Sequence, residues 1–249
     1  VTGVQTCALP ICRQLSSMQV QYADVLLVRS VTNVNQALLA DSRVRFVGSA
    51  TIGADHLDAE WLASQQIHMT TAPACNARSV VEYVLTALAA VAARKDIDLS
   101  NKVLGVVGLG NVGFLLATVA QSLGLKVVGC DPFVTRSTIS QCSFEELLAT
   151  ADIVSFHTPL TRNGEYPTYH LLNSQSLALL KPNSILLNTG RGAVIDNQAL
   201  LSFVESNPTF FTAIVLDVWE GEPLIHQQLL EKVTIATPHI AGYSLEGRT

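Results

Sequence analysis

Charged residues are scarce in this sequence, and none of them gather in a block of one sign. They make up 14% of the 249 residues, and 15 Lys and Arg against 20 Asp and Glu leave a formal net charge of −5. Proteins that bind nucleic acid usually present a basic patch or stripe. The composition therefore predicts that nucleic acid is not a partner.

Long apolar runs are also absent. The longest, at residues 83–93, has about half of the ~20 residues that a transmembrane helix requires, and it is Ala-rich like a buried helix. Residues 1–11 lack the charged start and the apolar core of a signal peptide. We therefore expect a soluble protein with no membrane partner.

Cysteine is sparse and irregularly spaced. The five Cys residues are an odd number, form no CxxC pair and accompany no cluster of His. Because a zinc site or a disulfide framework would need such spacing, we expect neither a bound metal nor disulfides. A reducing cytoplasm is the location that fits.

Apolar residues make up 49% of the chain, enough to fill the interiors of two domains. In the C-terminal part, β-branched runs alternate with segments of helix length. The runs are continuously apolar, which is typical of a parallel sheet that helices cover on both faces. The sequence thus predicts a doubly wound α/β domain at residues 99–238. Its strands are expected at residues 103–107, 126–130, 152–156, 184–188, 212–216 and 233–236.

Polar residues are placed to cap three helices, and two of them have Glu three residues later, the capping-box spacing. The predicted helices are residues 79–94, 144–149 and 197–205, with Ser79, Ser143 and Asp196 as their caps.

Residues 13–98 repeat the alternation of strands and helices more weakly and predict a second, smaller α/β domain. The polar stretch at residues 95–102 is the expected domain boundary. Residues 1–12 have no periodicity and resemble a translated sequencing-library adapter, so we expect them to be non-native. Residues 239–249 are expected to begin a return to the smaller domain.

A GxGxxG motif, formed by Gly108, Gly110 and Gly113, lies between a predicted strand and a predicted helix. The first Gly permits a tight turn, the second lets the backbone approach a pyrophosphate, and the third allows close packing of the helix on the strand. The amides of Asn111 and Val112 would stand at the helix N-terminus, facing the phosphates. The motif predicts a dinucleotide site, with a loop that only packs as the alternative.

Asp131 closes the strand that follows this motif. A carboxylate in that place accepts hydrogen bonds from the adenosine ribose hydroxyls and would repel a 2′-phosphate. The expected cofactor is therefore NAD rather than NADP.

Three candidate catalytic residues follow three successive predicted strands: Arg191, Glu222 and His239. Because the carboxyl ends of parallel strands share one edge of the sheet, we expect them to converge there. Imidazole suits proton transfer from an alcohol near neutral pH, a carboxylate would fix its tautomer, and the Arg fork would hold a substrate carboxylate. Taken singly, each residue is as readily explained as structural.

The glycine motif and the segments TGRG (189–192), DVWEGEP (217–223) and TPHIAG (237–242) resemble the D-isomer-specific 2-hydroxyacid dehydrogenases over about residues 20–249. The resemblance implies a Rossmann NAD domain beside a smaller, flavodoxin-like substrate domain. It also implies that Arg191, Glu222 and His239 are the catalytic residues.

Further segments, VRSVT (28–32), ATIG (50–53) and HIAGYSLEG (239–247), resemble the family members that act in vitamin B6 biosynthesis. These oxidise 4-phospho-D-erythronate to 2-oxo-3-hydroxy-4-phosphobutanoate with NAD, so a phosphorylated 2-hydroxy acid is the implied substrate. The implied substrate contacts are Ser30, Thr51 and Tyr243, with Arg29 as a candidate phosphate ligand or salt-bridge partner. The implied cofactor contacts, besides the glycine motif, are Asp131, Thr158, Asp217 and Gly242.

The sequence departs from the family pattern in several places. Phe114 stands where Arg is frequent and Ala74 where Gly is usual, and we expect nucleotide binding despite both. The resemblance implies a homodimer, but family chains continue past Thr249 into a dimerisation domain, so dimerisation cannot be assumed for this chain. Two alternatives remain: another dehydrogenase of the family, such as one acting on 3-phosphoglycerate, or a non-catalytic, NAD-sensing module like a corepressor.

Overall fold

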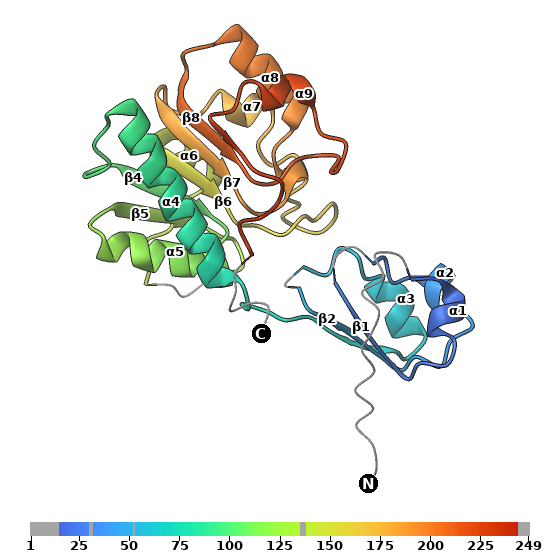
Figure 1. The fold of residues 1–249 in the computed structure, drawn as a ribbon. Helices are drawn as coiled ribbons and strands as arrows, with labels where there is room; N and C mark the ends of the chain where they lie inside the picture. Colours follow the sequence, from blue (N-terminus) through green and yellow to red (C-terminus); the bar gives the residue numbers. More distant parts are fainter. Residues whose placement is uncertain (1–14, 30–31, 52, 135–137, 244–249) are drawn as a thin grey trace. The chain divides into compact units, whose positions relative to one another are not determined.

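A computed structural model describes residues 15–29, 32–51, 53–134 and 138–243. The chain divides into two compact units, residues 1–75 and 76–249, each of which is described by itself (Figure 1). Among the described residues, no helix combines the length and the apolar character that crossing a bilayer requires.

The first unit contains a parallel sheet of three strands in the order β1 (Val25–Val28), β2 (Phe46–Ser49) and β3 (His68–Thr70). On β1, Leu26 is buried whereas the side chain of its neighbour Leu27 is 61% exposed, so the strand buries one face only. Three short helices pack on that face. They are α1 (Ser17–Val20), α2 (Gln36–Leu39) and α3 (Ala59–Ser64).

The second unit is built on a parallel sheet of six strands in the order β5-β4-β6-β7-β8-β9. The predicted strands are confirmed, with ends that differ by two residues at most. Their bounds are β4 (Val103–Val107), β5 (Lys126–Cys130), β6 (Ile153–Phe156), β7 (Ser184–Asn188), β8 (Phe211–Leu216) and β9 (Ile235–Ala236). An isolated bridge from Gly129 to Gln141 adds one further parallel pairing beyond β5.

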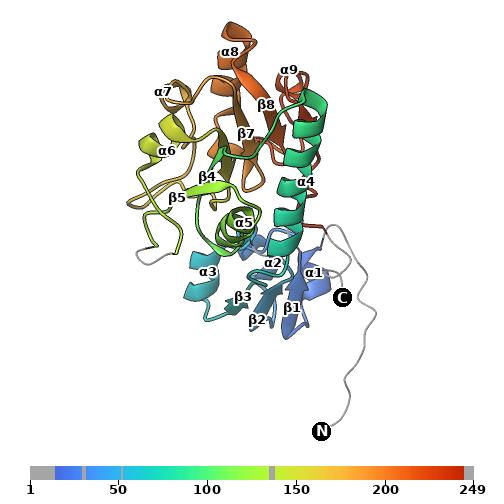
Figure 2. The same ribbon diagram turned by 90° about the vertical axis from the view of Figure 1, so that its left-hand side faces the viewer.

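Helices cover both faces of this sheet, as the continuously apolar strands predict (Figure 2). Neighbouring strand residues serve opposite cores, since Ile153 packs with α4 and α5 whereas Val154 packs with α6 and α8. The fold is therefore doubly wound. Its helices are α4 (Ala77–Lys95), α5 (Asn111–Ser122), α6 (Phe144–Thr150), α7 (Ser174–Leu177), α8 (Asn197–Ser206) and α9 (Gln227–Leu230), with a 3₁₀ turn at Gly192–Val194.

Two of the three predicted helix caps are confirmed. The Ser143 hydroxyl accepts the Glu146 N–H in a capping box, and the Asp196 carboxylate accepts the Ala199 N–H. The third is wrong, because α4 begins at Ala77 and Ser79 lies inside its first turn. The sequence offered a capping pattern there, but the helix extends one turn further back.

The division between the units falls at the start of α4, not in the polar stretch after its end. Val80, Val84 and Leu88 on α4 are buried against α5 and the six-stranded sheet. This packing places the helix in the second unit, whereas the sequence analysis assigned it to the smaller domain.

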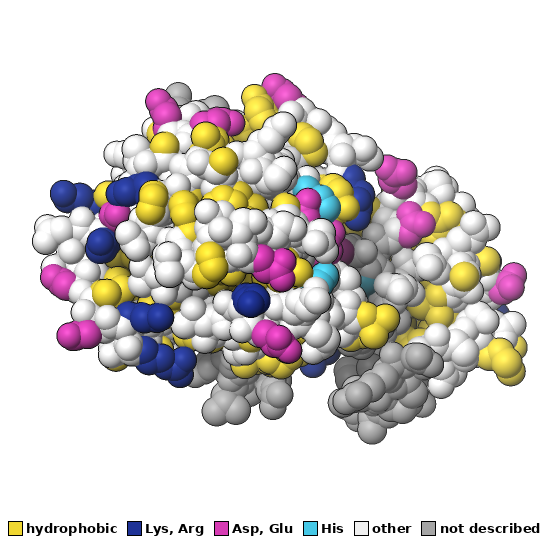
Figure 3. Space-filling model, turned by 90° about the horizontal axis from the view of Figure 1, so that it is seen from above, with side chains coloured by type: hydrophobic (Ala, Val, Ile, Leu, Met, Phe, Trp, Pro, Cys, Tyr) yellow, Lys and Arg dark blue, Asp and Glu magenta, His cyan; other side chains and the backbone are white. Residues whose placement is uncertain are grey.

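On the face shown in Figure 3, Lys and Arg side chains are interspersed with Asp and Glu.

Candidate active site

The glycine motif forms a tight turn between β4 and α5. Gly108 has φ +90°, a conformation that L side chains rarely adopt, and a Cβ on Gly113 would overlap the Gly108 carbonyl oxygen. Around Gly110, in contrast, no atom lies within 4 Å of the place a Cβ would take. The first glycine is thus required by its backbone conformation and the third by close packing, and the second leaves open space at the helix N-terminus.

The residues around this turn fit a dinucleotide. Asp131, just after β5, accepts the Leu109 N–H at 2.8 Å and the Phe133 N–H at 3.0 Å, so the protein holds its carboxylate in place beside the turn. Each carboxylate oxygen keeps lone pairs that ribose hydroxyls could use. The Thr158 hydroxyl is buried with no partner among the described residues, and its methyl group lies next to Gly108. Such an orphaned hydroxyl fits a polar group of a bound cofactor.

The loop after β7 carries Arg191 and is shaped by Asn188. The buried Asn188 side chain accepts the Gly190 N–H at 3.0 Å and donates to the Arg191 carbonyl at 2.9 Å. A Cβ on Gly192 would overlap the Trp219 backbone, so this loop lies directly against the loop after β8. Sequence analysis singled out Arg191 but missed Asn188, the last residue of a predicted strand.

His239 and Glu222 meet as predicted. His239 Nδ1 lies 2.9 Å from Glu222 Oε2, and because a carboxylate only accepts, the ring nitrogen donates. The other carboxylate oxygen, Oε1, accepts the Trp219 N–H at 2.7 Å. With Nδ1 so engaged, Nε2 is the ring nitrogen left for a substrate.

The electrostatics of this pair favour the charged form of both groups. The hydrogen bond to Glu222 raises the pKa of His239 above its usual value; burial and the Arg191 charge oppose this, and the Glu222 and Asp217 charges assist it. Burial raises the pKa of Glu222, but hydrogen bonds from His239 and the Trp219 N–H, with the His239 and Arg191 charges, hold it below its ordinary value. Arg191 is therefore close enough to act on both.

Asp217 is fully buried, and both of its oxygens accept hydrogen bonds from the segment 237–241. Gly242 lies against Asn76, whose amide nitrogen a Cβ on Gly242 would overlap. The cofactor contacts predicted for Asp217 and Gly242 stay predictions. Tyr243 is 60% exposed at the end of the described segment, and its substrate contact stays a prediction too.

Three other predicted substrate residues belong to the first unit. The Thr51 hydroxyl lies 2.8 Å from that of Ser49, which in turn lies 2.8 Å from His56 Nε2. Arg29 directly follows β1. Ser30 lies outside the described residues. The roles of all three toward a substrate stay predictions.

Comparison with known proteins decides the family. Residues 79–241 match the model for the NAD binding domain of the D-isomer specific 2-hydroxyacid dehydrogenases. The chain belongs to this family. The match covers the glycine turn, Asp131 and the three candidate catalytic residues, so the NAD-binding domain that the sequence predicts is confirmed.

Several relatives that are about 50% identical to this chain share one name. The chain is 49% identical to erythronate-4-phosphate dehydrogenase of Pseudomonas entomophila, over 95% of this chain and 61% of the relative. It is 52% identical to that of Pseudomonas aeruginosa, over 90% and 59%, and 49% identical to one from Acinetobacter baumannii, over 95% and 66%. The chain thus spans about three-fifths of the length of these dehydrogenases.

Solved structures share the fold. D-lactate dehydrogenase from Aquifex aeolicus, complexed with NAD and lactic acid, is 25% identical with a TM-score of 0.82, over 94% of this chain and 81% of that one. The TT0316 protein from Thermus thermophilus is 28% identical with a TM-score of 0.82, over 93% and 80%.

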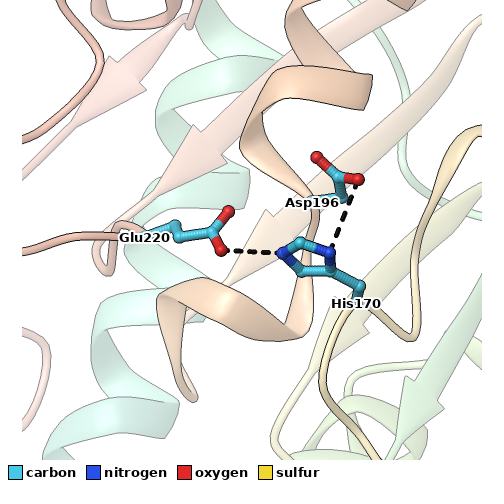
Figure 4. Close-up of side chains that lie close together, drawn as sticks. All are labelled: His170, Asp196 and Glu220. Atoms are coloured by element: carbon cyan, nitrogen blue, oxygen red, sulfur yellow. Dashed lines mark hydrogen bonds and ion pairs between the residues drawn. The ribbon is translucent and has the colours of Figure 1, made fainter.

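A second cluster of titratable side chains escaped the sequence analysis, which left His170 out of the site. Its imidazole lies between two carboxylates (Figure 4): Nε2 donates to Glu220 Oε1 at 2.7 Å, and Nδ1 lies 3.5 Å from Asp196 Oδ2. The nitrogens face different carboxylates, and the remaining oxygens accept the N–H groups of Ala199 and Asn197. This geometry favours a hydrogen-bonded link among three loops over a cation site.

The two glycines of the turn should respond differently to alanine. We expect Gly113→Ala to lower the free energy of unfolding by about 2 kcal/mol or more, because its Cβ overlaps backbone. Gly110→Ala, at an extended backbone with open space, should stay within about 0.5 kcal/mol of the parent yet weaken NAD binding about tenfold or more. Urea denaturation and NAD titration measure both. Equal NAD affinity in Gly110→Ala would contradict the assignment of this turn to the pyrophosphate.

The ion pair predicts a pH window of stability. The pKa of His239 is raised, so its contribution is complete below the ordinary value of 6.5 and is lost as pH rises through the folded pKa. The pKa of Glu222 is lowered, so its contribution is complete above 4.5 and is lost as pH falls. Glu222→Gln should therefore destabilise the protein most between these pH values, as urea denaturation across pH would show. If the loss of unfolding free energy in Glu222→Gln does not vary with pH, this result would argue against an ion pair between His239 and Glu222.

The link at His170 should stabilise the second unit. We expect His170→Ala to lower the free energy of unfolding by about 1–3 kcal/mol, because Glu220 loses a charge-assisted partner. His226→Ala, which removes a 3.2 Å exposed hydrogen bond to Gln198, is the matched control and should cost less than about 1 kcal/mol. Equal losses of stability in both variants would show that the hydrogen bonds of His170 contribute no more than the exposed bond of His226.

Proposed function

We propose that this chain carries the NAD-binding and catalytic residues of a dehydrogenase that oxidises 4-phospho-D-erythronate to 2-oxo-3-hydroxy-4-phosphobutanoate. The observation that carries the proposal is the 2.9 Å contact between His239 and Glu222 in the same unit as an intact glycine turn. The shared name of relatives at 49–52% identity supports the choice of substrate.

In the oxidative direction, His239 Nε2 takes the proton of the substrate hydroxyl. Glu222 holds the opposite nitrogen as a donor, which leaves Nε2 with a free lone pair in the neutral ring. Once the proton has been transferred, the Glu222 carboxylate stabilises the imidazolium that forms. NAD, when bound, accepts the hydride that leaves the same carbon. Proton and hydride together account for both hydrogens lost by the alcohol.

Arg191 has the chemistry to hold the substrate. Its guanidinium offers a planar fork for a carboxylate and its charge polarises the carbonyl that develops beside it. The Asn188 contacts fix the backbone that carries it. The proposal assigns the phosphorylated end to hydroxyl and cationic side chains, namely Arg29, Ser30, Thr51 and Tyr243.

Asp131, Thr158, Asp217 and Gly242 complete the proposed NAD contacts together with the glycine turn. For Thr158 the support is its orphaned buried hydroxyl beside Gly108. For Asp131 it is a carboxylate held beside the turn by two backbone N–H groups. We place the reaction in the cytoplasm, in pyridoxal phosphate biosynthesis, and expect the full-length enzyme to form the family's homodimer.

The test uses the full-length protein with 4-phosphoerythronate and 3-phosphoglycerate in parallel, following NADH by its near-ultraviolet absorbance. We expect turnover of the first substrate, and His239→Ala should lower it at least about 100-fold with little change in NAD affinity. His68→Ala, which removes an exposed imidazole of the first unit, is the control.

The alternatives are outcomes of the same test. Preference for 3-phosphoglycerate would make the protein a different dehydrogenase of the family. NAD binding without turnover of either substrate would favour a sensing module, and unchanged turnover in His239→Ala would remove that residue from the mechanism.

A further inference from the structure

Asp217 is a fully buried carboxylate at the end of β8 around which the segment 237–241 is wound. Its Oδ1 accepts the Thr237 hydroxyl at 2.6 Å and the Ile240 N–H at 2.8 Å, and its Oδ2 accepts the Ala241 N–H at 2.9 Å. Its own backbone carbonyl accepts the His239 N–H at 2.7 Å. The backbone of the segment that carries His239 is thus held by one residue.

These contacts fix the direction of a longer hydrogen-bond chain. Backbone N–H groups occupy both oxygens of Asp217, the pattern of an ionised carboxylate, so the Thr237 hydroxyl must donate its single proton to Asp217. The Tyr83 hydroxyl lies 2.6 Å from that same Thr237 oxygen, and it can only be the donor. The chain runs from Tyr83 through Thr237 to Asp217.

Tyr83 is suited to be the fixed end of this chain. It lies on α4, and burial, aided by the charge of Asp217, keeps the pKa of its phenol above the ordinary value, so the hydroxyl retains the proton that it donates to Thr237. Val80 and Val84, its neighbours on the helix, are buried in the core against the sheet. A side chain 154 residues away in sequence thereby anchors Thr237 to α4.

Thr237 also reaches the partner of His239. Its carbonyl accepts the Trp219 indole N–H at 3.0 Å, and the backbone N–H of Trp219 holds Glu222 at 2.7 Å. Both members of the pair, His239 and Glu222, are therefore tied to the same residue.

Packing alone does not fix the position of the His239 side chain. It is 49% exposed, and its backbone has φ 55°, a left-handed conformation that non-glycine residues adopt only when surrounding contacts impose it. The contacts that impose it are those made to Asp217 on either side of His239.

We propose that Tyr83 is a positioning residue for His239, acting through the directed chain from its hydroxyl to Thr237 and Asp217. The chain keeps His239 Nδ1 within hydrogen-bonding distance of Glu222 and so fixes the position of Nε2. The inference rests on the proposed function for the role of His239, while the positioning itself is independent of any substrate.

The variants are chosen to leave the fold intact. Tyr83→Phe and Thr237→Val each remove one hydroxyl from the chain without changing its volume much, whereas Thr237→Ser keeps the hydroxyl. Tyr166→Phe removes a phenol hydroxyl from an exposed loop residue and is the matched control. Two readouts are used: the pKa of His239 from an NMR titration of its imidazole, and kcat and KM of the full-length enzyme.

We expect Tyr83→Phe and Thr237→Val to lower the pKa of His239 and to reduce kcat about tenfold, with little change in the KM for NAD, since small misplacements of a catalytic group are costly. Thr237→Ser and Tyr166→Phe should behave like the parent. The double variant should lose no more than Thr237→Val alone, because both changes break one chain.

An unchanged pKa of His239 in Tyr83→Phe, with only the melting temperature lowered, would show a purely structural hydroxyl and overturn the proposal. The NMR readout needs no substrate. A shifted pKa in a full-length protein that turns over neither phosphorylated acid would therefore support the positioning and count against the proposed function alone.

Discussion

Because the six strands of the second sheet are all parallel, the loops that leave their carboxyl ends lie along one edge, and the candidate catalytic side chains of that unit come from those loops. The glycine turn leaves β4, Asp131 follows β5, and Thr158 lies two residues beyond β6. Further along the edge come the loops of Arg191, Glu222 and His239. Strand direction alone brings together residues that are far apart in sequence.

The parallel sheet brings the loops to one edge but does not fix their exact positions. Contacts between the loops fix these positions. Gly192 lets the loop after β7 lie directly against the backbone at Trp219. His170 links Glu220 with Asp196, and Asp217 holds the segment of His239. Each of these contacts joins neighbouring loops rather than a loop and its own strand. The loops at this edge are therefore connected to one another by hydrogen bonds and close backbone packing.

The sequence predicts the sheet well and the links between loops poorly, for a physical reason. Strands such as β4 and β7 have continuously apolar interiors, so hydrophobicity alone indicates where these strands lie. The glycine spacing likewise encodes a local turn. Tyr83 and Thr237, in contrast, are 154 residues apart, and no local pattern indicates that they touch. The same holds for the place of α4, whose apolar face suits either unit until its packing is known.

The charges around His239 are balanced between two demands of acid–base chemistry. A higher pKa makes imidazole a stronger base toward an alcohol, but it also lowers the fraction of neutral ring that can accept a proton at a given pH. Glu222 and Asp217 raise the pKa of His239, and Arg191 opposes them. Burial of the ring lowers its pKa as well, so two influences on each side act on the same imidazole: a hydrogen bond and carboxylate charges that raise the pKa, and burial and the Arg191 charge that lower it. In the proposed mechanism, Arg191 would therefore lower the pKa of the base as well as hold a substrate carboxylate.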